Sequence, residues 1–447
     1  CHGFDVTFVH TEHNRRRLLH ARGPDALAGT PGFRFAAVPD GLPASDDEDA
    51  AQDMPALHFS LATAVPHFKK LVLSQSQLLL PSPTASCCCC LISDVDHILR
   101  AAEDIGLPCV NFWITSASSF MAFQQCQQLV AKGLVPLKDA EQLRNGYLDS
   151  TVIDWVPGLP ASMRLRDFPS FIRTTTRGSP SPCAQWTVKQ RWRGKAGFKP
   201  SRSQTASAIL PPVYAIGPLP LLLSGAGGGD LAIDDDASAG SSASSLSKEN
   251  RACLDWLDGK HPNSVVFASF GSLVKLTHQQ LVELAWGLAN SGYEFLWVIR
   301  SDQQQQLLLA NGGTATAAAV LRHEAVGAFL THCGWNSMLE SVCAGVPMLC
   351  WPFAGDQQPN SRLACTECRV GVELGEEPRR EEVATAIRQV MGGERGEQLR
   401  RSVAEWKEKA ALAARPGGSS WANLEKLANE VLPSLIVIAA HKHWIRC

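Results

Sequence analysis

The sequence has little net charge and no membrane-length apolar segment, and each shortage disfavours a class of protein. Its 447 residues include 41 lysines and arginines and 43 aspartates and glutamates. Nucleic-acid-binding domains usually carry a basic excess, so this class is disfavoured. The longest apolar run near the C-terminus, residues 431–440, is about half of what a membrane-spanning helix needs. We therefore expect neither a nucleic-acid partner nor a membrane span.

A regular disulfide framework and a metal-binding cluster are also lacking. The 15 cysteines follow no regular spacing apart from a run at residues 87–90, and no signal peptide is recognisable. This pattern favours reduced thiols in the cytosol, so we predict a cytoplasmic protein. Cys365 and Cys368 form a single C-x-x-C without the second pair that a structural zinc site requires. No metal site is therefore predicted.

What the sequence does contain is a repeated unit in which a glycine separates a helical end from an apolar strand. The glycines are residues 3, 106, 292 and 345, and the strands after them are predicted at residues 4–9, 108–113, 295–299 and 346–351. Glycine is the usual left-handed residue after a helix. Strands rich in Val, Ile, Phe and Trp suit parallel sheets that are buried on both faces. The alternation predicts an α/β doubly wound architecture.

Length and composition predict two domains. A chain of 447 residues exceeds the size at which one hydrophobic core usually stops growing. A stretch rich in Gly, Ser and Asp separates the halves and is predicted to be a flexible linker. We therefore predict an N-terminal α/β domain, the linker, a C-terminal α/β domain and an atypical tail, at residues 1–222, 223–250, 251–430 and 431–447. The foreign-looking segments 177–207 and 303–319 indicate insertions, deletions or reading-frame errors.

The chemistry is carried by residues 326–357, whose pattern is that of a strand, a tight turn, a helix, a glycine, a strand and a loop. Gly334 in the turn allows the backbone to approach a ligand closely. Asn336 and Ser337 open the helix, so unpaired N–H groups and the positive end of the helix dipole face the ligand. A diphosphate suits such a place.

Three further polar residues extend this candidate site. Glu340 lies one helical turn after Asn336 and Ser337, on the same face. Asp356 and Gln357 follow the next strand and therefore reach the same carboxyl edge of the sheet, where open α/β sheets bind ligands. A carboxylate and an amide suit the hydroxyl groups of a sugar. Each residue alone has an ordinary explanation, such as a helix cap, a solvated charge or a turn, and only the ordered combination is specific.

This combination resembles the donor-binding box of the plant secondary-product UDP-glycosyltransferases, a family with the GT-B fold. The resemblance implies two facing Rossmann-like domains with the active site in the cleft between them. It looks closest to the subgroup of cyanohydrin, terpenoid and flavonoid O-glucosyltransferases. It extends over most of the chain, through residues 14–19, 31–35, 39–43, 146–148, 154–155, 214–218, 255–257, 270–272 and 416–420.

The resemblance also implies roles at the phosphates. His332, Asn336 and Ser337 would bind the diphosphate, and Trp335 would contribute mainly its backbone. Ser272 would touch the phosphates from the facing loop.

At the sugar end, the resemblance implies that Glu340 holds the ribose hydroxyls. Asp356 and Gln357 would hold the transferred sugar, and glutamine at the last position of the box favours glucose. The partners are then a UDP-sugar donor and a hydroxylated small-molecule acceptor. UDP-glucose acts as a co-substrate, and neither a metal nor another cofactor is required.

The sequence departs from the family pattern just before the box. The family has a Trp-x-Pro-Gln segment whose Trp stacks on uracil and whose Gln reaches the ribose. Residues 315–320 stand there instead and contain neither side chain. Stacking contributes about 1–3 kcal/mol per base in comparable settings, so donor affinity is expected to fall by roughly ten- to a hundredfold.

A second departure concerns the general base. In the family, a histidine after the first strand deprotonates the acceptor, whereas this chain starts on a segment that resembles the second strand. His2, His10 and His13 lie around that strand and do not match the expected context. Asp94 matches the aspartate that orients the base, with Asp96 as the alternative, although a polar strand end would explain either.

The sequence therefore predicts transfer of glucose from UDP-glucose to a hydroxyl group of a small lipophilic acceptor, with inversion at the anomeric carbon and impaired turnover in this chain. The main alternative is a non-catalytic remnant that binds nucleotide sugars weakly, or a pseudogene product. An NAD-dependent oxidoreductase would need a G-x-G-x-x-G after its first strand, and none is found. Residues 436–447 lack family character and are interpreted as readthrough.

Overall fold

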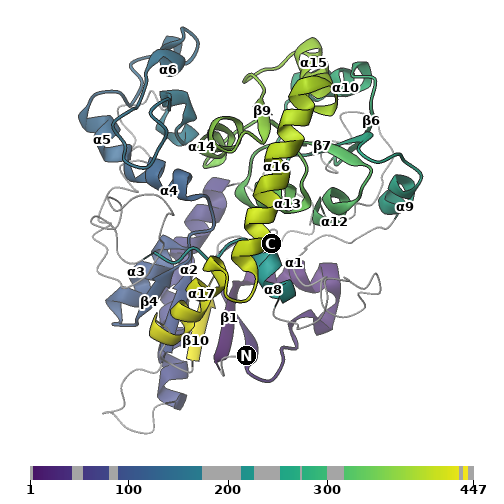
Figure 1. The fold of residues 1–447 in the computed structure, drawn as a ribbon. Helices are drawn as coiled ribbons and strands as arrows, with labels where there is room; N and C mark the ends of the chain where they lie inside the picture. The colour runs from purple at the N-terminus through teal and green to yellow at the C-terminus, as the bar shows by residue number, and fades with distance from the viewer. Residues whose placement is uncertain are drawn as a thin grey trace.

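The computed structural model describes residues 4–42, 54–79, 89–173, 213–225, 252–271, 274–299, 317–431 and 436–440. Within these ranges the chain forms two five-stranded sheets, and every strand pair in them is parallel (Figure 1). The predicted α/β architecture with parallel sheets is therefore confirmed. The predicted linker lies almost entirely outside the described residues, and the domain boundaries stay predictions.

The first sheet belongs to the N-terminal half, but its central strand comes from the other end of the chain. Its order is β2-β1-β10-β3-β4. The strands are β1 (Asp5–Thr11), β2 (Phe33–Val38), β3 (Cys89–Ser93), β4 (Cys109–Asn111) and β10 (Ile436–Ala440). Within the predicted atypical tail, residues 436–440 form a regular strand. The sequence concealed this because an apolar β-branched run carries no local signal for which strands it will join.

Helices cover this sheet and supply its core. They are α1 (Glu12–Arg22), α2 (Met54–Leu79) and α3 (Asp96–Asp104), with a short turn η1 (Pro24–Leu27) after α1. The hydroxyl of Thr11 accepts a hydrogen bond from the backbone N–H of Asn14, which fixes where α1 begins after β1. Phe68 of α2 is fully buried in one cluster with Val9 of β1 and Leu91 of β3. Strands β1 and β3, which flank β10, therefore pack against one shared core.

A small helical lobe follows the first sheet and has a core of its own. Leu129, Ile153, Leu165 and Phe168 are fully buried in it. Its elements are α4 (Ala117–Gln124), α5 (Cys126–Ala131), η2 (Ala140–Leu143), α6 (Tyr147–Ser150), η3 (Leu165–Asp167) and η4 (Ser170–Ile172). Figure 1 shows this lobe beside α14 of the C-terminal half, and contacts of α14 (Gln357–Arg362) with η3 and α4 confirm the proximity.

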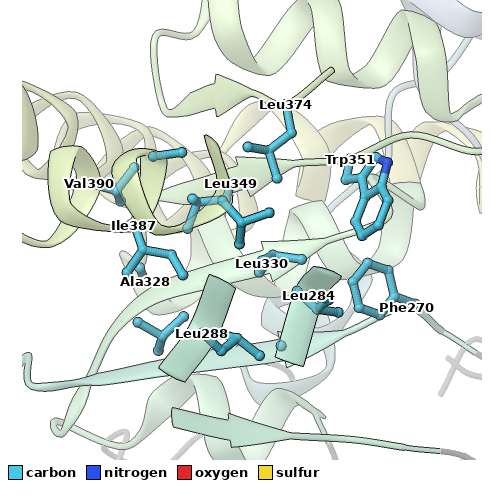
Figure 2. Packing of buried hydrophobic residues seen from close by; sticks show 14 of the residues in the cluster. Phe270, Leu284, Leu288, Ala328, Leu330, Leu349, Trp351, Leu374, Ile387 and Val390 are labelled. Atoms are coloured by element: carbon cyan, nitrogen blue, oxygen red, sulfur yellow. The ribbon is translucent and has the colours of Figure 1, made fainter. Parts of the chain in front are cut away.

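The second sheet, in the order β6-β5-β7-β8-β9, forms the centre of the C-terminal half. Ala328, Leu330 and Leu349 point from it toward α10 and α15 (Figure 2). Phe267 and Phe329 point to the opposite side, which α12 and α13 cover. The strands are β5 (Val265–Ser269), β6 (Glu294–Trp297), β7 (Val326–Thr331), β8 (Met348–Cys350) and β9 (Gly371–Glu373). The helices are α9 (Ala252–Asp258), α10 (His278–Asn290), α12 (Ala317–Arg322), α13 (Trp335–Ala344), η7 (Leu363–Glu367) and α15 (Arg380–Met391).

Two local signals in this half are confirmed. The hydroxyl of Thr277 accepts from the N–H of Gln280, and the side chain of Gln280 accepts from the N–H of Thr277, so the predicted capping box opens α10. Gly345 ends α13 in the left-handed region, at φ 84°.

The last helices carry the chain back to the first sheet. Figure 1 shows α16 (Gly393–Ala414) running from the second sheet toward α17 (Ser419–Lys426) and β10. There the hydroxyl of Ser420 donates to the carbonyl oxygen of Gly217, ahead of α8 (Leu219–Gly225), and η8 (Leu427–Val431) precedes β10. Among the described helices, none combines the length and the apolar character needed to cross a membrane.

Candidate functional site

The predicted anion-binding turn lies between β7 and α13, and a hydrogen bond to the end of β7 stabilises it. Cys333 is fully buried and adopts a left-handed backbone, with φ 64°. Its N–H donates to the hydroxyl of Thr331, at 3.2 Å. A left-handed backbone is unfavourable for most residues, so this turn needs such support to persist.

Two glycines make room for the imidazole of His332 in this turn. A Cβ atom added at Gly334 would lie 2.5 Å from the Nε2 atom of His332, and one added at Gly271 would lie 2.8 Å from it. Gly271 follows β5, so the loops after β5 and β7 meet at this ring. Ser272, the predicted phosphate contact on the β5 loop, lies outside the described residues. The geometry explains why Gly334 must be glycine: the imidazole occupies the space of its missing side chain.

The first turn of α13 has the character of an anion site. Gly334 is its N-cap, no side chain caps the helix, and the first turn holds no acidic residue. The backbone N–H groups near Asn336 and Ser337 therefore face outward with the positive end of the helix dipole. Both residues lie where the sequence predicted them, at the helix tip beside His332.

Glu340 follows one turn later on α13 and is partly buried. Its negative charge, after burial, is the second cause that raises the pKa of the Cys343 thiol, to about 11. Glu340 thus lies on the same helix as Asn336, one turn further along. Its contact to a ribose stays a prediction.

Asp356 is brought to the same edge by a residue that the sequence analysis missed. The side-chain amide of Asn360 donates to Asp356 Oδ2 at 2.7 Å and to the carbonyl oxygen of Cys333 at 3.1 Å. Asn360 is fully buried on α14, one helical turn after Asp356. One amide therefore ties the loop after β8 to the anion-binding turn. The i, i+4 spacing of Asp356 and Asn360 was the available signal.

Burial changes the protonation of this carboxylate. It raises the pKa of Asp356 from 3.8 to about 6, while the hydrogen bond from Asn360 opposes the shift. Asp356 is therefore ionised at neutral pH and becomes neutral in mildly acidic solution.

Gln357 lies beside Asp356, and its carbonyl oxygen bonds to the backbone of its own loop. Its Oε1 atom accepts from the N–H groups of Phe353, at 2.8 Å, and Ala354, at 2.9 Å. These bonds close the loop after β8. They orient the carboxamide so that its NH₂ group is the end left for a ligand.

On the first sheet, Asp94 directly follows β3 at the carboxyl edge. The hydroxyl of Ser93 accepts from the N–H of Val95, at 3.1 Å, and shapes this turn. Asp96, the alternative, forms a half-exposed ion pair with Arg100 at 2.7 Å, one turn along α3. Asp96 therefore has a structural role of its own, and Asp94 stays the predicted site residue.

The histidines near β1 are packed as structural residues. His10 is buried, stacks on Phe35, and has its pKa lowered to about 4, mainly by burial and then by Arg15. The pKa of His13 on α1 is also lowered, first by burial and then by Arg17. His2 lies outside the described residues. His10 is enclosed in the core, and that it does not serve as the base stays a prediction.

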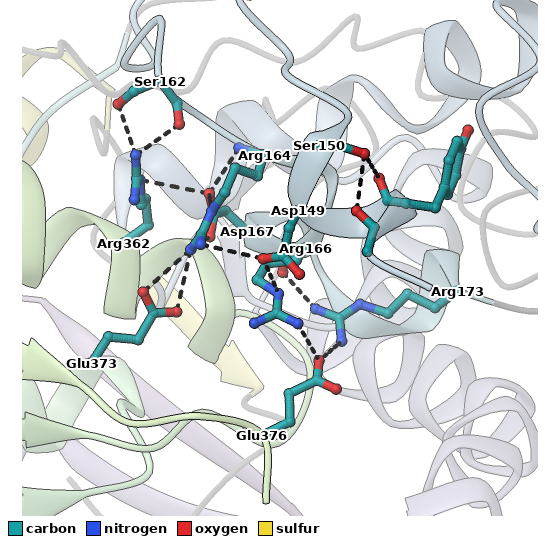
Figure 3. Close-up of polar contacts among 12 residues, drawn as sticks. Asp149, Ser150, Ser162, Arg164, Arg166, Asp167, Arg173, Arg362, Glu373 and Glu376 are labelled. Carbon is teal, nitrogen blue, oxygen red and sulfur yellow. Dashed lines mark hydrogen bonds and ion pairs between the residues drawn. The ribbon is translucent and has the colours of Figure 1, made fainter. Parts of the chain in front are cut away.

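A polar cluster joins the two halves next to this site (Figure 3). Arg164 lies 2.7 Å from Asp167 in its own half and 3.2 Å from Glu373 of β9. The hydrogen bond to Asp167 raises the pKa of Arg164 above its usual value. Arg173 lies 3.0 Å from Glu376. A cavity of about 240 Å³ opens here, and its lining includes Arg166, Arg173, Phe353, Gln358 and Glu376.

Two other predictions concern metals and the uracil site. In the described ranges, no group of three or more His, Cys, Asp and Glu side chains could hold a metal ion. Where the family's Trp-x-Pro-Gln segment is expected, residues 315 and 316 are not described, and the rest lies in α12 (Ala317–Arg322). No aromatic side chain is present in α12.

Comparison with known proteins places this geometry in context. The model of the "UDP-glucoronosyl and UDP-glucosyl transferase" family matches residues 234–401. The chain is 42% identical to a 7-deoxyloganetin glucosyltransferase of Gardenia jasminoides, over 96% of this chain and 92% of that protein. It is 40% identical to an (R)-mandelonitrile beta-glucosyltransferase of Prunus dulcis, over 97% and 92% respectively. The crystal structure of Os79 from O. sativa in complex with UDP superposes with a TM-score of 0.73, at 26% identity, covering 96% of this chain and 94% of that one.

Proposed function

The chain belongs to the plant UDP-glycosyltransferase family, and we propose that it transfers glucose from UDP-glucose to a hydroxyl group of a small lipophilic acceptor, with inversion at the anomeric carbon. The observation that carries the proposal is the amide of Asn360, which links Asp356 to the carbonyl of Cys333. This bond holds the carboxylate of Asp356 to the turn that precedes α13. A nucleotide diphosphate sugar would use both features in the proposed complex, the carboxylate for the sugar and the helix N-terminus for the diphosphate.

In the proposed donor complex, the diphosphate lies against the N-terminus of α13, with Asn336 and Ser337 as its nearest side chains. Developing negative charge on the departing UDP is then stabilised by N–H groups that are already oriented. His332 and the backbone of Trp335 complete this wall. Since the helix tip supplies positive potential, we expect turnover without an added divalent metal.

Glu340 holds the ribose in this proposal, and Asp356 with Gln357 holds the glucose. Charged Asp356 accepts hydrogen bonds from sugar hydroxyls, and the NH₂ of Gln357 donates one. The names of the relatives support glucose as the sugar and a small aglycone as the acceptor. Asp94 contributes from the opposite sheet, where it would orient the group that takes the acceptor's proton.

We further propose that turnover is slow. A positioned base contributes about 10²–10⁴ in rate. His10 is enclosed in the core and cannot reach an acceptor, and α12 offers no aromatic ring to the uracil. Both features lower the expected rate of glucose transfer, and both leave the proposed diphosphate site in place.

The test measures UDP binding by calorimetry and UDP release with a panel of phenols and alcohols. We expect UDP to bind, and Asp356→Ala to weaken UDP-glucose more than UDP, because the sugar contact is lost. Asp96→Ala is the matched control, since it removes an aspartate in a surface ion pair. If UDP does not bind the parent chain, the proposal fails.

The second candidate is a nucleotide-sugar-binding protein without turnover, which the enclosed position of His10 favours. It predicts the same UDP affinity but no UDP release with any acceptor. Release above the no-acceptor background excludes it.

A further inference from the structure

The central position of β10 in the first sheet is the feature that the proposed function leaves unexplained. Each of its residues pairs with β1 on one side and with β3 on the other: Ile436 lies opposite Asp5 and Cys89, and Ala440 lies opposite Val9 and Ser93. In the described part of the chain, β1 and β3 pair with β10 and not with each other. The last strand in sequence therefore connects two otherwise separate strand pairs, β2-β1 and β3-β4.

Without β10, the sheet would have a slot at its centre. Neighbouring strands lie about 4.8 Å apart, so β1 and β3 would stand roughly 10 Å apart with two rows of unpaired N–H and C=O groups. The core across the slot is already shared, because Phe68 packs with Val9 of β1 and Leu91 of β3. The slot thus has two hydrogen-bonding walls and a buried floor.

The segment that fills the slot is matched to it. Residues 436–440 read Ile-Val-Ile-Ala-Ala, and such apolar β-branched runs suit a parallel strand with neighbours on both sides. Parallel ladders on both walls also fix the direction of the inserted strand. A segment running the other way would not reproduce this register.

The chain delivers the strand from an anchored position. The hydroxyl of Ser420 donates to the carbonyl of Gly217 at 2.7 Å, and the amide of Asn423 donates to that of Ala215 at 2.9 Å. Leu427 is buried with Cys90 of β3 and Val110 of β4. These contacts fix α17 and η8 against the N-terminal half, a few residues before β10 starts.

We propose that the space between β1 and β3 is a strand-binding slot, that its occupant is the chain's own segment 436–440, and that the slot accepts this segment when it is supplied on a separate molecule. The N-terminal sheet is then completed by residues 436–440. This inference rests on strand pairing and not on the proposed transferase activity.

The first test removes the strand from the full chain. We expect a chain that ends at Val431 to lose roughly 10 °C in Tm, because the ladders to β1 and β3 disappear together. A soluble carrier protein fused to residues 432–447 should bind this truncated chain and restore its Tm. The same fusion with Ile438→Pro should not bind, since proline removes a ladder N–H. Ile438→Val is the matched control and should bind.

The second test keeps the chain intact, in case the truncated form does not fold. Directly paired residues in a sheet lie within the Cα separation that a disulfide tolerates, about 4.4–6.8 Å. Ile436→Cys should therefore form a disulfide with Cys89 under diamide oxidation, detected by mass spectrometry, and Cys89→Ala should abolish it. A bond within one chain or between two chains supports the slot. An unchanged Tm on truncation, equal binding of the proline fusion, or no bond at residue 89 overturns the proposal.

Discussion

At the scale of single residues, the candidate site contains energetically unfavourable features that neighbouring groups stabilise. Cys333 holds a left-handed backbone, and its carbonyl accepts from Asn360, which also restrains Asp356. Burial alone would keep Asp356 neutral to a higher pH, and the amide of Asn360 opposes this. The buried amide of Asn360 therefore bonds both the turn at Cys333 and the carboxylate of Asp356.

The pKa of Asp356 predicts how donor binding depends on pH. The carboxylate form, which accepts from sugar hydroxyls, predominates above a pH of about 6. We expect KM for UDP-glucose to rise as the pH falls through that value. Asp356→Asn should raise KM by about 10- to 100-fold at pH 7.5, since a hydrogen bond to a charged group contributes about 1.5–3 kcal/mol, and should flatten the profile. Asp96→Asn should behave as the parent; an unchanged pH profile in Asp356→Asn contradicts the assignment.

Gly334 gives a steric prediction. A Cβ atom there would lie 2.5 Å from His332, so Gly334→Ala must displace the ring or the turn. We expect UDP affinity to fall by roughly 10-fold or more, equivalent to about 1.4 kcal/mol. Gly259→Ala is the control, because its added Cβ meets only an ordinary contact at 3.7 Å. Equal UDP affinity in the two variants would exclude a close fit at Gly334.

The buried histidine of β1 gives a prediction about stability. The unfolded chain takes up a proton near pH 6.5, whereas folded His10 stays neutral down to about pH 4. Stability contributed by neutral His10 is therefore lost as the pH falls from about 6.5 to 4, by about 3 kcal/mol. His10→Phe should gain that amount relative to the parent between pH 7 and 4, measured by urea unfolding. The exposed control His20→Gln should show no such trend.

At the scale of elements, the sequence predicted the features that depend on residues close together in the chain. The capping box at Thr277, the left-handed end of α13 at Gly345, and the order of strand, turn and helix around His332 were all readable. Boundaries moved by one or two residues: the strand predicted at residues 4–9 is β1 (Asp5–Thr11). Asn360 was not predicted as a site residue, because its role depends on the carbonyl of Cys333, which is distant in sequence.

The strand β10 shows the limit of such reasoning. Residues 436–440 looked like an unrelated tail, although their composition suits a central parallel strand. Hydrophobic periodicity and composition indicate that a segment can form a strand, but tertiary packing determines which strands it pairs with. The family resemblance could not supply this placement either, since these residues lack the family's character.

At the scale of the whole molecule, ion pairs and backbone contacts hold the lobe of α4–α6 against the second sheet. The N–H of Gly355, next to Asp356, donates to the hydroxyl of Ser170 at 3.2 Å. Arg362 of α14 donates to the carbonyl of Ser162 at 2.7 Å. The loop that carries Asp356 is therefore bonded to the opposite half, so movement between the halves should also move this loop.

Glu376 is the position at which this coupling can be measured. It lies 3.0 Å from Arg173 and 3.7 Å from Arg166, and Arg173 is largely buried, with 14% of its side chain exposed. Burial lowers the pKa of Arg173, whereas Glu376 raises it, so the carboxylate compensates a buried cation. Removing Glu376 leaves that charge with its remaining bond to the carbonyl of Arg166.

We expect Glu376→Gln to lower stability by about 1–2 kcal/mol, because it leaves a largely buried charge less compensated while the glutamate is itself half exposed. Added salt should lower the stability of the parent chain toward that of the variant, because salt partly screens the pair of Glu376 and Arg173. The control Glu405→Gln removes an exposed pair with Lys409 at 3.9 Å and should change stability by less than about 0.5 kcal/mol. Urea unfolding at low and high salt measures both. Because Ser170, three residues before Arg173, accepts from the N–H of Gly355 next to Asp356, Glu376→Gln should also raise KM for UDP-glucose with kcat little changed. A loss of stability with an unaltered KM would show that the cluster acts on folding alone.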